Sequence, residues 1–191
     1  MGAGKRDLAR RLAARQGKRR LTDIEAEEIF ATSKSVEATV VWTVSDTTQA
    51  RSRVRVFNSM SENLYIDMRI DPALPGSSSW IFTWGDKSKA EFSENLRRLD
   101  LRASHRNPDG ERWSRKTHKH RWSEEFSNRF AYTPTDIPHD VNAGIDSTDN
   151  YREVFEAFAT ECKIELGQDY RWSDPPLDCQ GSNQQGLWVI S

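Results

Sequence analysis

The middle of the chain alternates polar and hydrophobic residues with the two-residue period of a half-buried strand. The clearest case is residues 51–56, where Arg51, Arg53 and Arg55 alternate with smaller or apolar residues. Because successive side chains of a strand point to opposite faces, these arginines are expected on one face. Similar β-branched and aromatic segments predict six strands, at residues 36–44, 51–57, 64–70, 79–84, 96–103 and 117–122.

Helical periodicity flanks these strands on both sides. Thr22 followed by Glu25 fits a capping box and predicts a short helix over residues 22–30, with Leu21, Ile24 and Ile29 on its apolar face. Residues 151–165 place an apolar stripe at helical spacing, formed by Tyr151, Val154, Phe155, Phe158 and Cys162. The pattern predicts an α+β fold: an antiparallel meander sheet or half-barrel of about six strands, flanked by an N-terminal and a C-terminal helix.

Length and composition limit the domain organisation. The chain has 191 residues and a mean hydropathy of −0.81, but its 7 Trp and 8 Phe supply enough bulky side chains for one core. We expect a basic arm over residues 1–20 that forms a flexible helix. A single α+β domain over residues 21–170 and a C-terminal tail over residues 171–191 are expected to follow it.

Charge is distributed unevenly along the chain. Residues 1–20 hold eight Lys or Arg and one Asp, whereas residues 131–191 hold three basic and eleven acidic residues. The basic arm is either a solvated tail or a contact for nucleic acid, with RNA favoured, and the acidic C-terminal half suits a protein partner. No stretch approaches the roughly 20 apolar residues of a membrane span. With no export signal, Cys162 and Cys179 are expected to be reduced, and the location to be cytoplasmic.

Three of the four histidines fall within sixteen positions. His118 and His120 alternate in a predicted strand, so they should share a face and lie roughly 6–7 Å apart. Residues 107–110 read Asn-Pro-Asp-Gly, which is typical of a tight turn. If this turn joins a hairpin, His105 returns beside His118.

Such a cluster suits two kinds of chemistry. His105, His118 and His120 can bind a divalent metal, zinc or manganese, with Glu124 or Asp109 as a further ligand or base. Without a metal, the same three histidines can act as general acid and base in phosphodiester cleavage while Glu124 orients an imidazole. Phosphate would then be bound by the nearby cationic residues Arg98, Arg102, Arg115 and Lys119. The third interpretation is a set of surface histidines hydrogen-bonded to Asp100 or Glu124.

The same segment carries a family resemblance. Its pattern is an Arg-Leu-Asp strand from Arg98, a His-x-Asn-Pro-Asp-Gly turn from His105, a His-x-His-x-Trp-x-Glu strand from His118, and Ala131-Tyr132. This pattern resembles a small family of uncharacterised bacterial and phage-encoded proteins over roughly residues 21–165. Ala103 and Thr117 depart from the family's glycine and proline. The resemblance implies a small standalone protein of bacteria or mobile elements and supplies no activity.

The sequence lacks the motifs of several enzyme classes, including GxxxxGK[ST], GxSxG, HExxH, GxGxxG and paired CxxC. We therefore favour a small phosphodiesterase or endoribonuclease that uses the histidine cluster, in the role of a toxin or defence effector. The alternative is a non-catalytic accessory that binds nucleic acid or protein, including an antitoxin-like partner of a bacterial or phage system.

Overall fold

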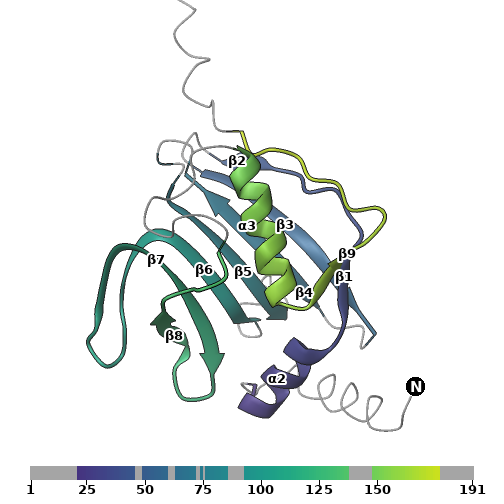
Figure 1. The fold of residues 1–191 in the computed structure, drawn as a ribbon. Coiled ribbons are helices and arrows are strands. Elements are labelled where there is room, and N and C mark those ends of the chain that lie inside the picture. Colours follow the sequence, from purple (N-terminus) through teal and green to yellow (C-terminus); the bar gives the residue numbers. More distant parts are fainter. Residues whose placement is uncertain are drawn as a thin grey trace, which may run out of the picture.

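A computed structural model describes residues 21–45, 49–59, 63–71, 74, 76–85, 93–137 and 148–176. In these ranges the chain forms one open sheet of nine strands and two helices (Figure 1). The predicted basic arm, the tail after residue 176, His139 and Cys179 lie outside the described residues. The strands are β1 (Lys34–Val36), β2 (Thr43–Ser45), β3 (Gln49–Asn58), β4 (Leu64–Ile70), β5 (Ser78–Gly85), β6 (Ser93–Arg106), β7 (Arg112–Ser123), β8 (Ser127–Tyr132) and β9 (Ile164–Leu166).

The strand order is β8-β7-β6-β5-β4-β3-β1-β9, with β2 paired to β3. The antiparallel meander is confirmed for β3 to β8, where each strand pairs with the next. The prediction of about six strands is wrong, because the sheet has nine strands in the described ranges, and the sheet does not close into a barrel. The additional strands β8 and β9 are short edge strands without the alternation that marks the others.

The predicted strand over residues 36–44 divides into β1 and β2. Between them the chain leaves the ladder, and the Val40 N–H donates to the carbonyl of Arg171 at 2.8 Å. One continuous run of strand-forming residues therefore contributes to two separate strands. The hydrogen-bond partners of the backbone, rather than the β-propensity of the residues, determine where each short strand ends.

Helix α2 (Asp23–Ala31) begins with the predicted capping box. The Glu25 N–H donates to Thr22 Oγ1 at 3.2 Å, and the Thr22 N–H donates to the Glu25 carboxylate at 2.9 Å. Leu21 and Ile29 are buried as predicted. The placement of Ile24 is wrong, because its side chain is 73% exposed.

Helix α3 (Thr148–Glu161) packs across one face of the sheet (Figure 1). All five residues of its predicted apolar stripe are buried, and the rings of Tyr151 and Trp80 lie 6.1 Å apart. The helix ends at Glu161, four residues before the predicted end, because the chain turns and β9 pairs in parallel with β1. The main core therefore lies between α3 and the sheet.

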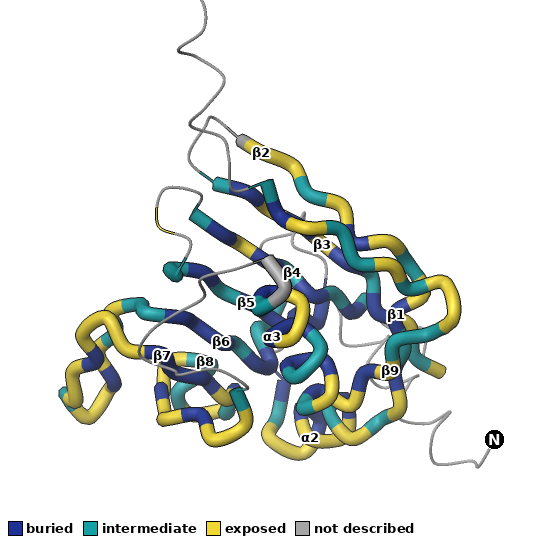
Figure 2. Tube along the Cα trace, turned by 45° about the horizontal axis from the view of Figure 1, so that its top comes forward, coloured by how far each residue is buried: buried dark blue, intermediate teal, exposed yellow. Residues whose placement is uncertain are grey.

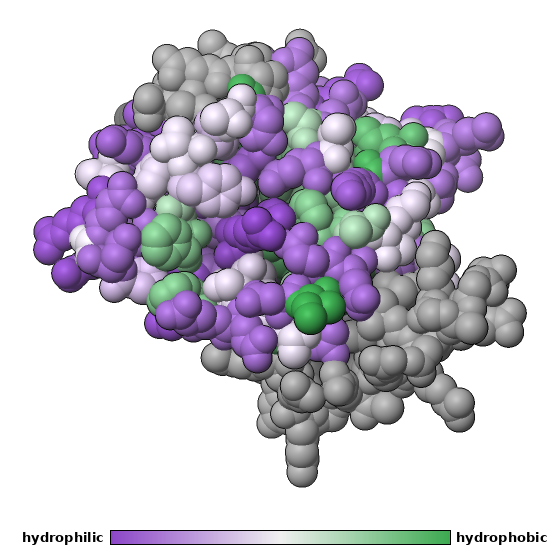
Figure 3. Space-filling view, turned by 60° about the horizontal axis from the view of Figure 1, so that its bottom comes forward, coloured by the Kyte–Doolittle hydropathy of each residue, from purple (hydrophilic) through white to green (hydrophobic). Residues whose placement is uncertain are grey.

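The opposite face of the sheet is polar. Along β3, Arg51 and Arg53 are exposed and alternate with buried Ser52 and Val54, as predicted, and the tube in Figure 2 shows this change along the strand. A different side of the molecule, the one that lies at the bottom of Figure 1, is also mostly hydrophilic, with hydrophobic side chains only scattered over it (Figure 3). None of the helices in the described ranges combines the length and apolar character needed to cross a membrane.

Candidate functional site

The three clustered histidines lie on the hairpin formed by β6 and β7. The predicted turn is confirmed, with the Gly110 N–H donating to the Asn107 carbonyl at 2.9 Å. Gly110 has a φ of 96°, a left-handed conformation that glycine adopts without a steric penalty. The turn therefore joins the strand that contains His105 directly to the strand that contains His118 and His120.

Two bulges interrupt the pairing of β6 with β7. The register shifts between Asp100 and Ala103 and again between Ala103 and His105. Arg102 and Arg115, which lie at these shifts, have φ values of 47° and 49°. A bulge inserts one residue and so reverses which face the following side chains point to. His105 therefore shares a face with Asp100, although an odd number of positions separates them.

The tip of the hairpin is bent onto the neighbouring strand β8. Asn107 Nδ2 donates to the Ala131 carbonyl at 3.0 Å, and the Ala131 N–H donates to Asn107 Oδ1 at 2.7 Å. The buried side-chain amide of Asn107 thus bonds the N–H and the carbonyl of Ala131 in place of a neighbouring strand. Figure 1 shows β6 and β7 curving away from the plane of the sheet. This curvature brings His105 back over β7.

As a result, the three imidazoles converge. The ring centroids are 4.7 Å apart for His105 and His120, 4.9 Å for His118 and His120, and 5.6 Å for His105 and His118. One ring nitrogen from each lies within 4.8 Å of the other two. His118 and His120 are 0% and 1% exposed, while His105 is half-buried and forms the outer side of the cluster.

Backbone carbonyls determine which nitrogens are available. His118 Nδ1 lies 2.8 Å from the Lys116 carbonyl, and His105 Nε2 lies 2.7 Å from the Arg129 carbonyl. A carbonyl only accepts, so these two nitrogens carry hydrogen and donate it. The remaining nitrogens, His118 Nε2 and His105 Nδ1, hold lone pairs when the rings are neutral. Metal-binding histidines are commonly oriented by this kind of hydrogen bond.

Asp100 is the fourth member of the cluster. Its Oδ2 lies 3.5 Å from His118 Nε2 and 3.3 Å from His120 Nε2, and its Oδ1 accepts from Arg98 Nε at 2.8 Å. The two Nε2 atoms are within ion-pair distance but are not aligned for hydrogen bonds, so both remain buried without a partner. Buried polar atoms without hydrogen-bond partners are costly, and a cation between these atoms would remove that cost.

The titration behaviour of the cluster follows from burial and charge. Burial alone would raise the pKa of Asp100, but His118, His120 and Arg98 outweigh it and hold this pKa well below its usual range. Burial lowers the pKa of His120 and exceeds the opposing attraction of Asp100. The cluster therefore favours an ionised carboxylate beside a neutral imidazole, which are the forms that bind metal.

The structure separates the other predicted site residues. Arg98 contacts the cluster through Asp100. Lys119 lies on the opposite face, where its ammonium contacts the carboxylates of Asp136 and Glu161. Glu124 is exposed beside α2, and its N–H donates to Asp23. The remaining predicted residues lie farther along the hairpin: Arg102 and Arg115 at the bulges and Asp109 in the turn.

Sequence reasoning considered Asp100 only as a hydrogen-bond partner and Asn107 only as a turn residue. The signal for Asp100 was available, because it pairs in register with His118 on the adjacent strand. Residues directly opposite on antiparallel strands have side chains close together on one face. The clamp made by Asn107, which is its pair of hydrogen bonds to Ala131, left no signal in the sequence, because β8 itself was not predicted.

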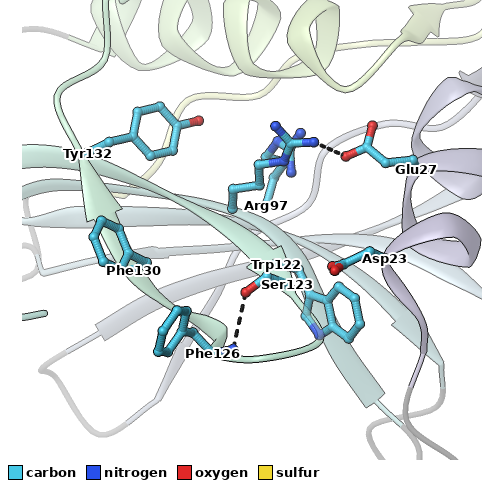
Figure 4. Close-up of a pocket in the computed structure, with 9 residues that line it drawn as sticks. Asp23, Glu27, Arg97, Trp122, Ser123, Phe126, Phe130 and Tyr132 are labelled. Atoms are coloured by element: carbon cyan, nitrogen blue, oxygen red, sulfur yellow. Dashed lines mark hydrogen bonds and ion pairs between the residues drawn. The ribbon is translucent and has the colours of Figure 1, made fainter. Parts of the chain in front are cut away.

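A larger cavity, of about 790 Å³, lies between α2 and the end of the sheet formed by β7 and β8 (Figure 4). Aromatic side chains including Phe126 and Phe130 line it, together with Arg97 and Arg121. Its two carboxylates already have partners: Glu27 contacts the Arg121 guanidinium, and Asp23 accepts from the Glu124 N–H. None of the three described histidines lines this cavity.

Together, the fold and the site define an α+β protein with an open sheet and a buried histidine–aspartate cluster on a bent hairpin. The chain belongs to DUF6978, a family of unknown function whose model matches residues 21–164. This range nearly coincides with that of the resemblance found in the sequence. Comparison with curated proteins and with solved structures found no match.

Proposed function

We propose that this protein is a metal-dependent phosphodiesterase whose metal is held by His105 Nδ1, His118 Nε2, His120 Nε2 and Asp100 Oδ2. The observation that supports this proposal is the spacing of these atoms. Tetrahedral ligands at a zinc–nitrogen distance of about 2.0–2.1 Å lie about 3.3–3.4 Å from one another. The contacts of Asp100 Oδ2 with the two buried Nε2 atoms, 3.3 and 3.5 Å, match this edge length.

The donor set favours zinc among the divalent metals. Three imidazoles and one carboxylate are borderline ligands that suit zinc better than magnesium or calcium, which prefer oxygen. The carbonyl contacts of His105 and His118 already hold these rings in the orientation that metal binding needs. The three ring nitrogens, which lie within 4.8 Å of one another, would move closer together around a bound ion.

The reaction class follows from what surrounds the cluster. A divalent ion with these four ligands would need a fifth coordination position for water, where it would acidify that water and stabilise charge that develops on a phosphoryl oxygen. Arg98 stands beside Asp100, and its side chain is 38% exposed, so it can both orient the carboxylate and meet a phosphate. His105, which is half-buried, lies on the accessible side of the cluster. These features support hydrolysis or transesterification of a phosphodiester.

The first test measures metal content. Wild-type protein dialysed against zinc should retain about one ion per chain by elemental analysis, and His118→Ala and His120→Ala should lose it. The matched control is His139→Ala, which changes the remaining histidine of the chain. Equal zinc content in all four proteins contradicts the metal centre.

The second test measures cleavage. Labelled single-stranded RNA should be cleaved by the zinc-loaded protein, and EDTA or either histidine substitution should abolish the cleavage. Loss with EDTA and recovery with zinc support the metal-dependent route. Cleavage that persists in EDTA but disappears in His118→Ala contradicts it and favours direct acid–base catalysis by the imidazoles.

One observation favours a second function, that of a non-catalytic accessory that binds nucleic acid. Asp100, His118 and His120 are at most 2% exposed, and with His105 they already supply four ligands. Structural zinc sites are closed in this way, whereas catalytic sites keep one position open for water. Stoichiometric zinc in a protein that leaves RNA intact under every condition would select this second function.

A further inference from the structure

Arginines are concentrated on the face of the sheet that carries the histidine cluster. The register aligns Arg51 of β3 with Arg69 of β4, and this row continues through Ser79 and Asp100 to His118. A second row begins with Arg53 and reaches Arg98 and His120 through Asp67 and Ile81. Two parallel cross-strand rows therefore lead from the arginines of β3 to the candidate metal ligands.

These rows contain more positive than negative charge. Their acidic members are Asp67, which lies 3.8 Å from Arg53, and Asp100, which is bound to Arg98. Arg51 and Arg69 are exposed, and Arg51 is oriented by the neutral side chain of Gln49. Because helix α3 packs on the other face, the described helices leave this cationic surface accessible.

Stacking contacts hold part of this surface in place. The Arg53 guanidinium lies 3.9 Å from the centre of the Tyr65 ring, and the Arg55 guanidinium lies 5.1 Å from it. Arg55 also donates to the Tyr65 hydroxyl at 2.9 Å. A planar guanidinium that is already positioned loses little conformational entropy on binding a phosphate. The positioned arginines are therefore better suited to binding a polyanion than to the general role of keeping the protein soluble.

A small cavity connects the arginine rows to the histidine cluster. It has a volume of about 220 Å³ and is lined by Arg69, Arg98, Ser78, Ser79 and Asp100, among others. Ser79 lies in the first arginine row between Arg69 and Asp100, whereas Ser78 alternates with it and faces the core side of the sheet. Two guanidiniums and the Ser79 hydroxyl are groups that bind phosphate oxygens. The cavity also shares Asp100 with the candidate metal centre.

The geometry points to a binding track for the backbone of single-stranded RNA, which crosses the sheet from β3 to the cavity at Asp100. Three strand spacings separate Arg51 from Asp100, or roughly 14 Å, so the track spans several successive phosphates. Because the metal ligands are nearly buried, a flexible single strand can bring a phosphate to them, whereas a rigid duplex cannot. Single-stranded RNA is thus the substrate that we infer for the proposed phosphodiesterase. Cleavage of this RNA rests on the proposed function, whereas binding of the RNA to the track does not.

The test compares two double variants of equal net charge. Arg51→Gln/Arg69→Gln removes two arginines of the track, and Arg152→Gln/Arg171→Gln removes two exposed arginines elsewhere. Binding of a fluorescein-labelled oligouridine strand of about twelve nucleotides is followed by polarisation in EDTA, between about 50 and 200 mM salt. The track variant should bind about tenfold more weakly at the lower salt, and its slope of log affinity against log salt should flatten by about 1.4.

The control variant should retain wild-type binding and slope. Equal losses in the two variants, no binding by the wild type, or tighter binding of a duplex of the same length would each overturn the track. The test is separable from the proposed function, because EDTA prevents metal-dependent cleavage. RNA binding that survives in a protein without any cleavage activity supports the track and contradicts the phosphodiesterase.

Discussion

At the scale of single residues, Asp100 determines the character of the site. It is 2% exposed, ionised, and in contact with two buried imidazoles and one guanidinium. A buried carboxylate is stable only when it is paired or coordinates a cation. Without Asp100 the histidines would form an ordinary polar cluster, and with it they form a ligand set of the size that zinc requires.

This role predicts the effect of Asp100→Asn. The amide has nearly the same shape but no charge, so the zinc affinity should fall by about 10- to 100-fold, as measured by competition with a chromophoric chelator. The matched control is Asp67→Asn, which removes another aspartate from the same face and should leave the zinc affinity unchanged. An Asp100→Asn protein that binds zinc as tightly as the wild type would exclude Asp100 as a ligand.

Cys162 illustrates a residue whose titration affects stability rather than function. The thiol is fully buried against α3 and the sheet, and burial raises its pKa far above the ordinary value, with a smaller contribution from Glu161. Because the pKa of the thiol is higher in the folded state than in the unfolded state, the protonated thiol contributes to the free energy of unfolding. This contribution is fully present below the unfolded pKa of about 8.5 and decreases as the pH rises above it.

The free energy of unfolding of a Cys179→Ser protein should therefore fall by about 1 kcal/mol between pH 8 and 9.5 on account of Cys162. Urea titrations at both pH values measure it. A Cys162→Ala/Cys179→Ser protein is the control and should lack this part of the decline. Equal pH dependence in the two proteins would show that the thiol ionises as readily in the folded state as in the unfolded state.

At the scale of elements, most strands and both described helices could be predicted from the sequence. Alternation located β3 to β7, and the capping box located the start of α2, because these signals are local. The edge strands β8 and β9 could not be predicted in the same way. β9 pairs with β1, which is distant in the sequence. β8 follows β7 in a tight hairpin, but its segment lacks a clear alternation of hydrophobic and polar residues.

The candidate site was only partly predictable for the same reason. Strand alternation placed His118 and His120 on one face, and the turn sequence placed His105 on the partner strand. The bulges at Arg102 and Arg115 left no clear mark in the sequence, since both positions hold a residue that rarely adopts a positive φ. Yet the bulge at Arg102 decides that His105 and Asp100 share a face of β6.

The clamp at Asn107 predicts that the bend of the hairpin can be released by one substitution. Asn107→Ala removes two hydrogen bonds to Ala131 and leaves buried backbone groups unpaired, so stability should fall by about 2 kcal/mol in urea titrations. The zinc affinity should fall as well, because His105 is no longer held over β7.

Asp109→Ala is the matched control, because Asp109 lies in the same turn but is exposed and, among the described residues, accepts only from the Glu111 N–H. It should leave the zinc affinity as it is in the wild type. If Asn107→Ala loses stability but binds zinc normally, the bend is not what brings His105 to the cluster.

At the scale of the whole molecule, the sheet divides the chain into a packing side and a polar side. The packing side holds α3 and the apolar core, while the polar side holds the arginine rows and the histidine cluster. The cluster joins β6, β7 and, through the carbonyl of Arg129, β8. A metal bound there would connect three strands at the edge of the sheet that α3 does not cover.

Zinc should therefore stabilise the whole fold and not only the hairpin. A ligand that binds the folded state alone adds about 2.7 kcal/mol at a free concentration of 100 times its dissociation constant. The Tm of the wild type should rise by several degrees with zinc and return to its starting value with EDTA, as measured by calorimetry. His120→Ala should show no such rise, whereas Arg152→Gln on α3 should respond like the wild type. A zinc-dependent rise that persists in His120→Ala would place the bound metal elsewhere in the chain.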